Sequence, residues 1–141
     1  MNNDLLSNIN WLAVVVAGLA YFVLGALWYS KILFAPSWIK LTGVNVEDPK
    51  MKTGMAQTMI SSLVLMIITS IGLAIIIGRI GATDWMTGLK VGLLTGVCFS
   101  ATAISISYLY EKRPMGLHLI NALYNIVGCA AAGVIIAAWP K

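Results

Sequence analysis

The sequence predicts an all-α membrane protein that crosses the bilayer four times as an antiparallel helical bundle. Of its 141 residues, 60% are hydrophobic and only 10% are charged, whereas an ordinary soluble domain carries about 25% charged residues. The apolar residues also form four long runs that are almost free of charge, at residues 9–30, 55–78, 85–110 and 117–139. About 20 residues are enough for a helix to cross the hydrocarbon core. Since the connecting loops are too short to fold alone, a single membrane domain is expected over residues 1–141.

The first apolar run is expected to stay in the protein as a spanning helix. A secretory signal peptide begins with basic residues and has an apolar stretch of about 7–15 residues. Residues 1–10 instead contain Asp4 and no lysine or arginine, and the apolar run that follows is longer.

The loop between the first and second runs is expected to hold a short helix in the headgroup region. Pro36 is a residue that starts helices, the side chains after it are mostly apolar, and Gly43 is expected to end the helix. Asp48 and Pro49 then form a good N-cap and first-turn pair. The second spanning helix is therefore expected to begin a turn or two before the membrane. The remaining loops are short, which predicts that consecutive helices pack as antiparallel neighbours.

The basic residues predict an orientation rather than a nucleic-acid partner. Six of the nine lie in the first and third loops, on one side of the membrane: Lys31, Lys40, Lys50, Lys52, Lys112 and Arg113. By the positive-inside rule that side faces the cytoplasm and both termini lie outside. The net charge of +4 is thus explained by loops that flank a lipid bilayer.

Small residues in the third run predict a helix-packing groove. Gly88, Gly92, Gly96 and Ser100 recur at every fourth position, so they share one face over about 18 Å. Another helix backbone can approach such a face closely, and close contact drives helix association in lipid. The partner is either a helix of the same chain or a second subunit.

The fourth run carries a stripe of polar residues. His118, Asn121 and Asn125 fall at i, i+3 and i+7 on one face, with Tyr124 at its margin. Asn125 lies about 15 Å along the helix from Met115, where an unpaired carboxamide facing lipid would cost several kcal/mol. The stripe is therefore expected to face the bundle interior. It forms either a structural hydrogen bond, with Tyr21 as a candidate partner, or the wall of a solute-binding site.

The sequence contains no arrangement typical of catalysis, metal binding or a cofactor. All five carboxylates lie in loops or at chain ends, whereas four-helix multidrug transporters use a glutamate in the first helix. His118 lies near Glu111, Lys112 and Arg113 at the predicted cytoplasmic rim, but it has no partners for a metal site. Cys98 and Cys129 are expected to be packing residues within spans.

The segments Asn10–Ala13, Phe22–Ser30 and Trp38–Gly43, together with Glu111–Pro114 and residues 117–139, resemble a bacterial membrane family known as "domain of unknown function 1761". The block Gly25-Ala26-Leu27-Trp28-Tyr29 is the most specific part of the resemblance. Asn121 departs from the pattern, since relatives are expected to carry an acidic residue there. The resemblance implies a bacterial inner-membrane protein, and the family has no established activity.

Three functional hypotheses follow from these observations. The leading hypothesis is a non-enzymatic homo-oligomer that binds or passes a small solute, and any sizeable cavity is expected to need several subunits. The second is an accessory or scaffold subunit of a larger membrane assembly, with no solute pathway. The third is a membrane-embedded enzyme that uses His118 and Glu111.

Overall fold

A computed structural model describes residues 4–140, in which all regular structure is helical. The elements are α1 (Trp11–Trp28), α2 (Ala35–Thr42), a 3₁₀ turn η1 (Pro49–Met51), α3 (Met55–Ile80), α4 (Trp85–Thr95), a π-helical segment η2 (Gly96–Ala101), α5 (Thr102–Tyr110) and α6 (Met115–Ala138). Four stretches are long and apolar enough to span a membrane: Trp11–Trp28, Pro49–Ile80, Trp85–Tyr110 and Met115–Ala138. The predicted fold class is therefore confirmed, and the protein is a multi-pass membrane protein.

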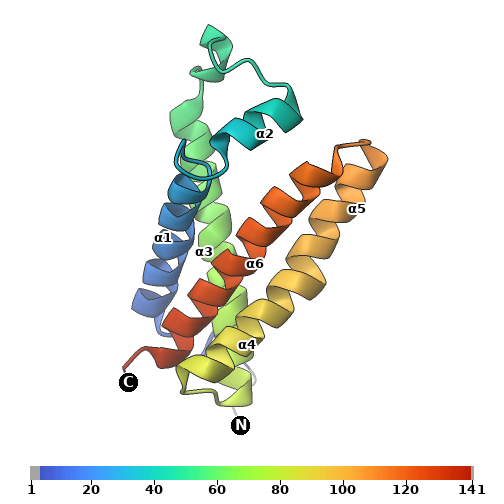
Figure 1. The fold of residues 1–141 in the computed structure, drawn as a ribbon. Helices are drawn as coiled ribbons and strands as arrows, with labels where there is room; N and C mark the ends of the chain where they lie inside the picture. Colours follow the sequence, from blue (N-terminus) through green and yellow to red (C-terminus); the bar gives the residue numbers. More distant parts are fainter. Residues whose placement is uncertain (1–3, 141) are drawn as a thin grey trace.

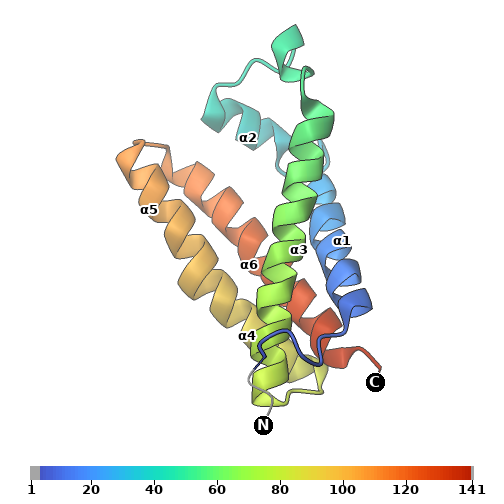
Figure 2. The ribbon, with the colours of Figure 1, turned by 180° about the vertical axis from the view of Figure 1, so that it is seen from behind.

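The four spanning segments form two pairs, as Figures 1 and 2 show. Helix α3 lies beside α1, and the continuous run α4–η2–α5 lies beside α6, while α6 also packs against α1 and α3. The two pairs meet at the end of the bundle that carries the second loop, residue 4 and residue 140, and they diverge toward the first and third loops. We call these the closed end and the open end.

The divergence corrects one expectation from the loop lengths. Helices α3 and α4 run antiparallel and contact each other near their short connection, but α3 and α5 separate toward the open end (Figure 1). A short loop sets the direction of the next helix and the place where it begins. The side chains along the two helices then decide how closely they pack.

The predicted short helix of the first loop is present as α2, which lies across the open end (Figure 1). Pro36 stands in its first turn, and Gly43 ends it with a left-handed backbone, φ +70°. Glycine suits this position because it has no Cβ to clash in that conformation.

The second spanning helix begins later than Asp48 and Pro49 predict. The Asp48 side chain accepts a hydrogen bond from the Lys50 amide, but only the 3₁₀ turn η1 follows. Gly54, with φ +76°, breaks the helical backbone before α3 starts at Met55. The capping pair thus starts a local turn, and the left-handed glycine separates that turn from the α-helix.

At the closed end, α4 and α6 are in backbone contact. A Cβ added to Gly92 would lie 2.6 Å from the Ala130 Cα, and one added to Gly96 would lie 2.7 Å from the Ile126 Cα. Gly88 and Gly133 face each other so closely that a Cβ on either would overlap the carbonyl oxygen of the other. These distances leave room only for hydrogen at the glycine positions.

At the open end, the buried side chains belong to α1 and α6. Helix α5 has none, and the buried residues of α3 (Ser70, Leu73, Ala74 and Ile77) all lie in its second half, toward the closed end. Along the third span, α4 has buried residues and α5 has none, and the change falls at the π-helical segment η2 between them. Such a segment widens a helix by one residue and turns the following helix to a new face.

Candidate binding cavity

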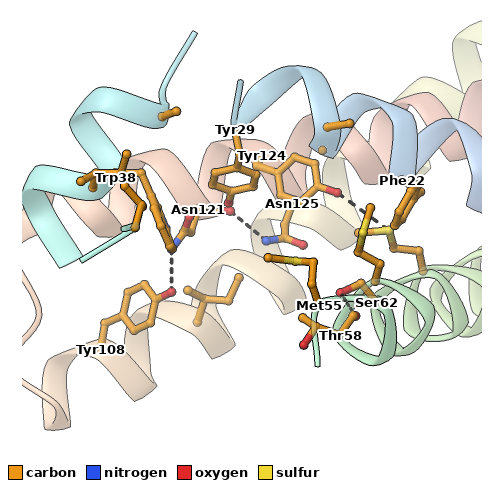
Figure 3. Close-up of a pocket in the computed structure, with 18 residues that line it drawn as sticks. Phe22, Tyr29, Trp38, Met55, Thr58, Ser62, Tyr108, Asn121, Tyr124 and Asn125 are labelled. Carbon is orange, nitrogen blue, oxygen red and sulfur yellow. Dashed lines mark hydrogen bonds between the residues drawn. The ribbon is translucent and has the colours of Figure 1, made fainter. Parts of the chain in front are cut away.

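A cavity of about 760 Å³ lies at the open end, with walls from α1, α2, α3, α5 and α6 (Figure 3). Helix α3 contributes mainly methionines to the wall, namely Met55, Met59 and Met66. Small residues of α1, Gly25 and Ala26, leave space on the opposite side. The cavity thus occupies the region where the two helix pairs diverge and α2 covers the end.

None of the 18 residues that line the cavity is charged. The polar groups in the wall are phenols, carboxamides, hydroxyls and one indole. An ion held here would lose its water without gaining an opposite charge, which is costly in a low-dielectric site. The wall therefore suits an uncharged guest.

Asn121 is at the centre of the polar part of the wall. Its Oδ1 accepts a hydrogen bond from the Tyr29 hydroxyl at 2.5 Å, and its Nδ2 donates to the Tyr108 hydroxyl at 2.7 Å. These bonds join the end of α1 to α6 and α6 to α5. Asn121 was predicted to face the bundle interior, and it does. Through these two bonds it connects α1, α5 and α6 around the cavity.

Asn125 makes a second set of contacts one turn deeper. The Tyr21 hydroxyl donates to its Oδ1, and its Nδ2 donates to the Asn121 carbonyl oxygen at 2.8 Å. The Tyr124 ring packs edge-on against those of Tyr21 and Tyr29, each with centroids 5.3 Å apart, and its hydroxyl donates to the Tyr21 carbonyl oxygen at 3.0 Å. Tyr124, expected at the margin of the stripe, lies buried among the other tyrosines.

The predicted cytoplasmic rim does not join this cluster. His118 is buried and packs edge-on against Tyr108, with ring centroids 5.2 Å apart. Glu111 is exposed and pairs with Arg113 at 3.6 Å, and Lys112 is exposed beside it with a left-handed backbone. No hydrogen bond joins His118 to Glu111 within residues 4–140.

The glycine face of the third span also lies away from the cavity, against α6 of the same chain. Ser100 extends it through a 3.8 Å contact between its hydroxyl and the Cys129 sulfur. Cys129 is buried and Cys98 is exposed, and both are free thiols. The sequence left two partners open for the glycine face, a helix of the same chain or a second subunit. In the structure, α6 of the same chain packs against it.

A single chain is enough to form the cavity, so the expectation that a sizeable cavity needs several subunits is wrong. That expectation assumed four helices packed along their whole length. Here the helices diverge beyond η2, and α2 lies across the open end and lines part of the cavity.

Among the aromatic wall residues that carry a polar group, Tyr29, Trp38 and Tyr108 were not singled out from the sequence as site residues. Aromatic residues at predicted interfaces are usually membrane anchors, so nothing marked these three as different.

The most specific sequence block forms one wall of this site. A model of the protein family described as "Protein of unknown function (DUF1761)" matches residues 12–137. The chain belongs to this family. Searches of the curated proteins and of the solved structures found no match.

In this DUF1761 member, the block from Gly25 to Tyr29 has structural roles that can be stated residue by residue. Gly25 leaves room for the Tyr124 hydroxyl, which a Cβ would approach to 2.6 Å, and Ala26 lines the cavity. Trp28 donates from Nε1 to the Ile120 carbonyl oxygen at 3.1 Å, and Tyr29 holds Asn121. The block therefore attaches α1 to α6 at the open end and shapes the cavity between them.

Proposed function

We propose that this protein binds an uncharged small molecule in the cavity at the open end, without catalysing a reaction on it. The observation that carries the proposal is a cavity of about 760 Å³ that has no charged side chain in its wall. Ligand sites are typically about 300–1,000 Å³, mostly apolar, with a few polar groups that fix orientation. The asparagine–tyrosine cluster supplies those polar groups.

The geometry supports binding better than catalysis. The asparagines, tyrosines and indole of the wall are weak acids and bases, and catalytic proton transfer works best with a group whose pKa lies near the working pH. His118, the single histidine of the sequence, packs against Tyr108 from outside the lining. The proposal therefore assigns the cavity to recognition.

The basic loops support a cytoplasmic position for the open end in the bacterial inner membrane. Six of nine lysines and arginines lie in the two loops at that end. Alkaline phosphatase fused to the C-terminus is expected to be active, because the enzyme folds only outside the cytoplasm. An inactive fusion beside a fluorescent green fluorescent protein fusion would reverse the orientation.

Binding is tested by filling the cavity. Radiolabelled 2-decanone and decane are expected to bind to the protein in lipid nanodiscs above the level of empty nanodiscs, whereas decanoate and decylammonium are not. Ala26→Phe, which places a ring in the cavity, is expected to abolish the excess binding. Leu27→Phe is the matched control, because Leu27 is its neighbour on α1, is 51% exposed and does not line the cavity. Equal binding by both variants, or equal binding of the charged compounds, would contradict the proposal.

The site lies within one chain, so one molecule is expected to bind per chain whether the protein is monomeric or a homo-oligomer. Native mass spectrometry in mild detergent reports both the number of copies and the ligand stoichiometry. A stoichiometry of one molecule per two chains would contradict a site formed by a single chain.

A further inference from the structure

Two hydrogen-bond donors in the cavity wall have no acceptor among residues 4–140. Trp38 on α2 makes no hydrogen bond through its indole nitrogen, although the indole of Trp28 does. Tyr108 on α5 accepts a bond from Asn121, and its own hydrogen is not donated to any described group. Figure 3 shows both residues at the cavity, with Asn121 beside them.

The free hydrogen of Tyr108 follows from the direction of the bonds through Asn121. The Tyr29 hydroxyl donates to the amide oxygen, so the amide nitrogen donates onward to the Tyr108 oxygen. A chain of donations in one direction leaves a single hydrogen free at its last member, and each bond polarises the next. Tyr108 is that last member, and it lies at the cavity.

The asparagines add both free hydrogens and free lone pairs to this part of the wall. The amide oxygens of Asn121 and Asn125 each accept one bond from a tyrosine hydroxyl and keep a second lone pair. Each amide nitrogen carries two hydrogens and makes one bond to a described residue. A guest at this position therefore meets neutral hydrogen-bonding groups and no charge, and Trp38 and Tyr108 supply donors that no described residue uses.

The opposite wall is apolar. Met55, Met59 and Met66 line it from α3, and the hydroxyl of Ser62 donates to the Thr58 carbonyl oxygen in its own helix. Methionine side chains are flexible and polarizable, so they adapt to an apolar body of irregular shape. The cavity thus has a polar, uncharged side at α2, α5 and α6 and an adaptable apolar side at α3.

We propose that the cavity binds an uncharged, membrane-soluble molecule through a carbonyl oxygen that accepts hydrogen bonds from Trp38 and Tyr108. A carbonyl oxygen has two lone pairs and accepts two bonds without carrying a charge, and the apolar remainder lies along the methionines. The assignment rests on the proposed function and makes it specific. The same chemistry is found in the ester of a neutral glycerolipid and in the ring carbonyl of a quinone.

The first test compares two probes that differ only by the carbonyl group. 2-Decanone is expected to bind about ten- to a hundredfold more tightly than decane to protein in nanodiscs, relative to empty nanodiscs, because it gains two hydrogen bonds and each bond between neutral groups is worth about three- to tenfold. Equal affinities would overturn the carbonyl assignment and leave the proposed function standing. Failure of both probes to bind would overturn both.

The second test removes each donor while keeping an aromatic ring. Trp38→Phe and Tyr108→Phe are each expected to weaken 2-decanone binding about three- to tenfold and to leave decane binding unchanged. Tyr110→Phe and Trp85→Phe are matched controls, since both side chains are exposed and outside the cavity lining. An equal loss for decane would show that the rings act by shape alone and would overturn the assignment.

A third measurement uses the unaltered protein, so it does not depend on the folding of a variant. The infrared carbonyl band of 2-decanone is expected to move to lower frequency when the ketone is bound in detergent-solubilised protein, because donated hydrogen bonds weaken the C=O bond. A band unchanged from that in protein-free micelles would overturn the proposal.

The two natural sources are then separated by competition against labelled 2-decanone. Displacement by dioctanoylglycerol supports an ester ligand, and displacement by a benzoquinone with a decyl chain supports a quinone ligand. Displacement by neither, under conditions where unlabelled 2-decanone competes, would overturn the assignment to a membrane-soluble carbonyl compound of these classes.

Discussion

The closed and open ends of this protein are made from the same helices but differ in the residues that face across them. At the closed end, glycines of α4 bring its backbone against that of α6, and no side chain fits between them. At the open end, the same span continues as α5 with no buried residue, and tyrosines reach across to asparagines of α6. Small residues therefore close one end, and large polar aromatic residues hold the other end apart.

The difference shows how a short membrane chain can form an open cavity between its helices. Apolar side chains gain little by meeting each other in lipid, so helices associate through close contact and polar pairing. Using close contact at one end and polar pairing at the other fixes the helices at an angle. The cavity is the result of that angle.

The largest expected effect is at the backbone contact. Gly92→Leu is expected to destabilise the fold by more than about 3 kcal/mol, since the side chain would overlap the backbone of Cys129 and Ala130, which cannot move aside. Gly72→Leu is the matched control, because a Cβ there meets nothing within 4 Å. Unfolding by SDS titration in mixed micelles measures both. Similar stabilities for the two variants would remove the backbone contact as the feature that closes this end.

The two halves of α3 are expected to respond differently to truncation. Leu73→Ala, at a residue 2% exposed in the closed half, is expected to cost about 2 kcal/mol through lost packing. Met59→Ala, at a residue 46% exposed on the cavity wall, is expected to change stability by less than about 0.5 kcal/mol. The same SDS titration compares them, and equal costs would mean that the open half is packed as tightly as the closed one.

Polar pairing is expected to contribute less per residue. Tyr21→Phe removes the hydroxyl that donates to Asn125 and is expected to cost about 0.6–2 kcal/mol. Tyr110→Phe removes a phenol that is 87% exposed and is expected to be neutral. A neutral Tyr21→Phe would show that water or lipid replaces the tyrosine, and the polar cluster would then not hold the helices in place.

The smallest expected effect lies at the start of α4, where Asp84 caps the helix. The Thr87 amide donates to its carboxylate, and this bond keeps the pKa of Asp84 below its ordinary value. A lowered pKa means that the cap stabilises the helix above the ordinary carboxyl pKa and is lost as the pH falls through the lowered one. The Thr87 amide proton is expected to shift in NMR spectra over that acidic range.

Asp84→Asn is the control for this titration, because an asparagine keeps the cap but cannot ionise. Its Thr87 amide shift is expected to be independent of pH over the same range. A shift that persists in the variant would assign the titration to another group.

Much of the fold could be predicted from local sequence. Long uncharged runs identify spanning helices, because only a helix satisfies its own backbone hydrogen bonds in lipid, and Pro36 and Gly43 mark the ends of α2. Asp48 and Pro49 misled because their local signal does not report Gly54, whose left-handed backbone separates the 3₁₀ turn from α3.

The site was predictable only in part, for a similar reason. Asn121 and Asn125 could be assigned to the interior from the cost of exposing an amide to lipid. Tyr29 and Tyr108, which bond to Asn121, could not be assigned to the interior in this way. An aromatic residue near the end of a span has the same local sequence pattern whether its side chain lies in the membrane interface or points into the bundle.

The sequence by itself determined that this chain lies in a membrane, how often it crosses and which residues need a polar partner, because each follows from the solvation of one segment at a time. Only the tertiary structure decided that the glycine face meets α6, that the helices diverge beyond η2 and that one chain forms an open cavity. Those outcomes depend on which faces of different helices meet, and the angle between two helices is set by all the residues at their contact.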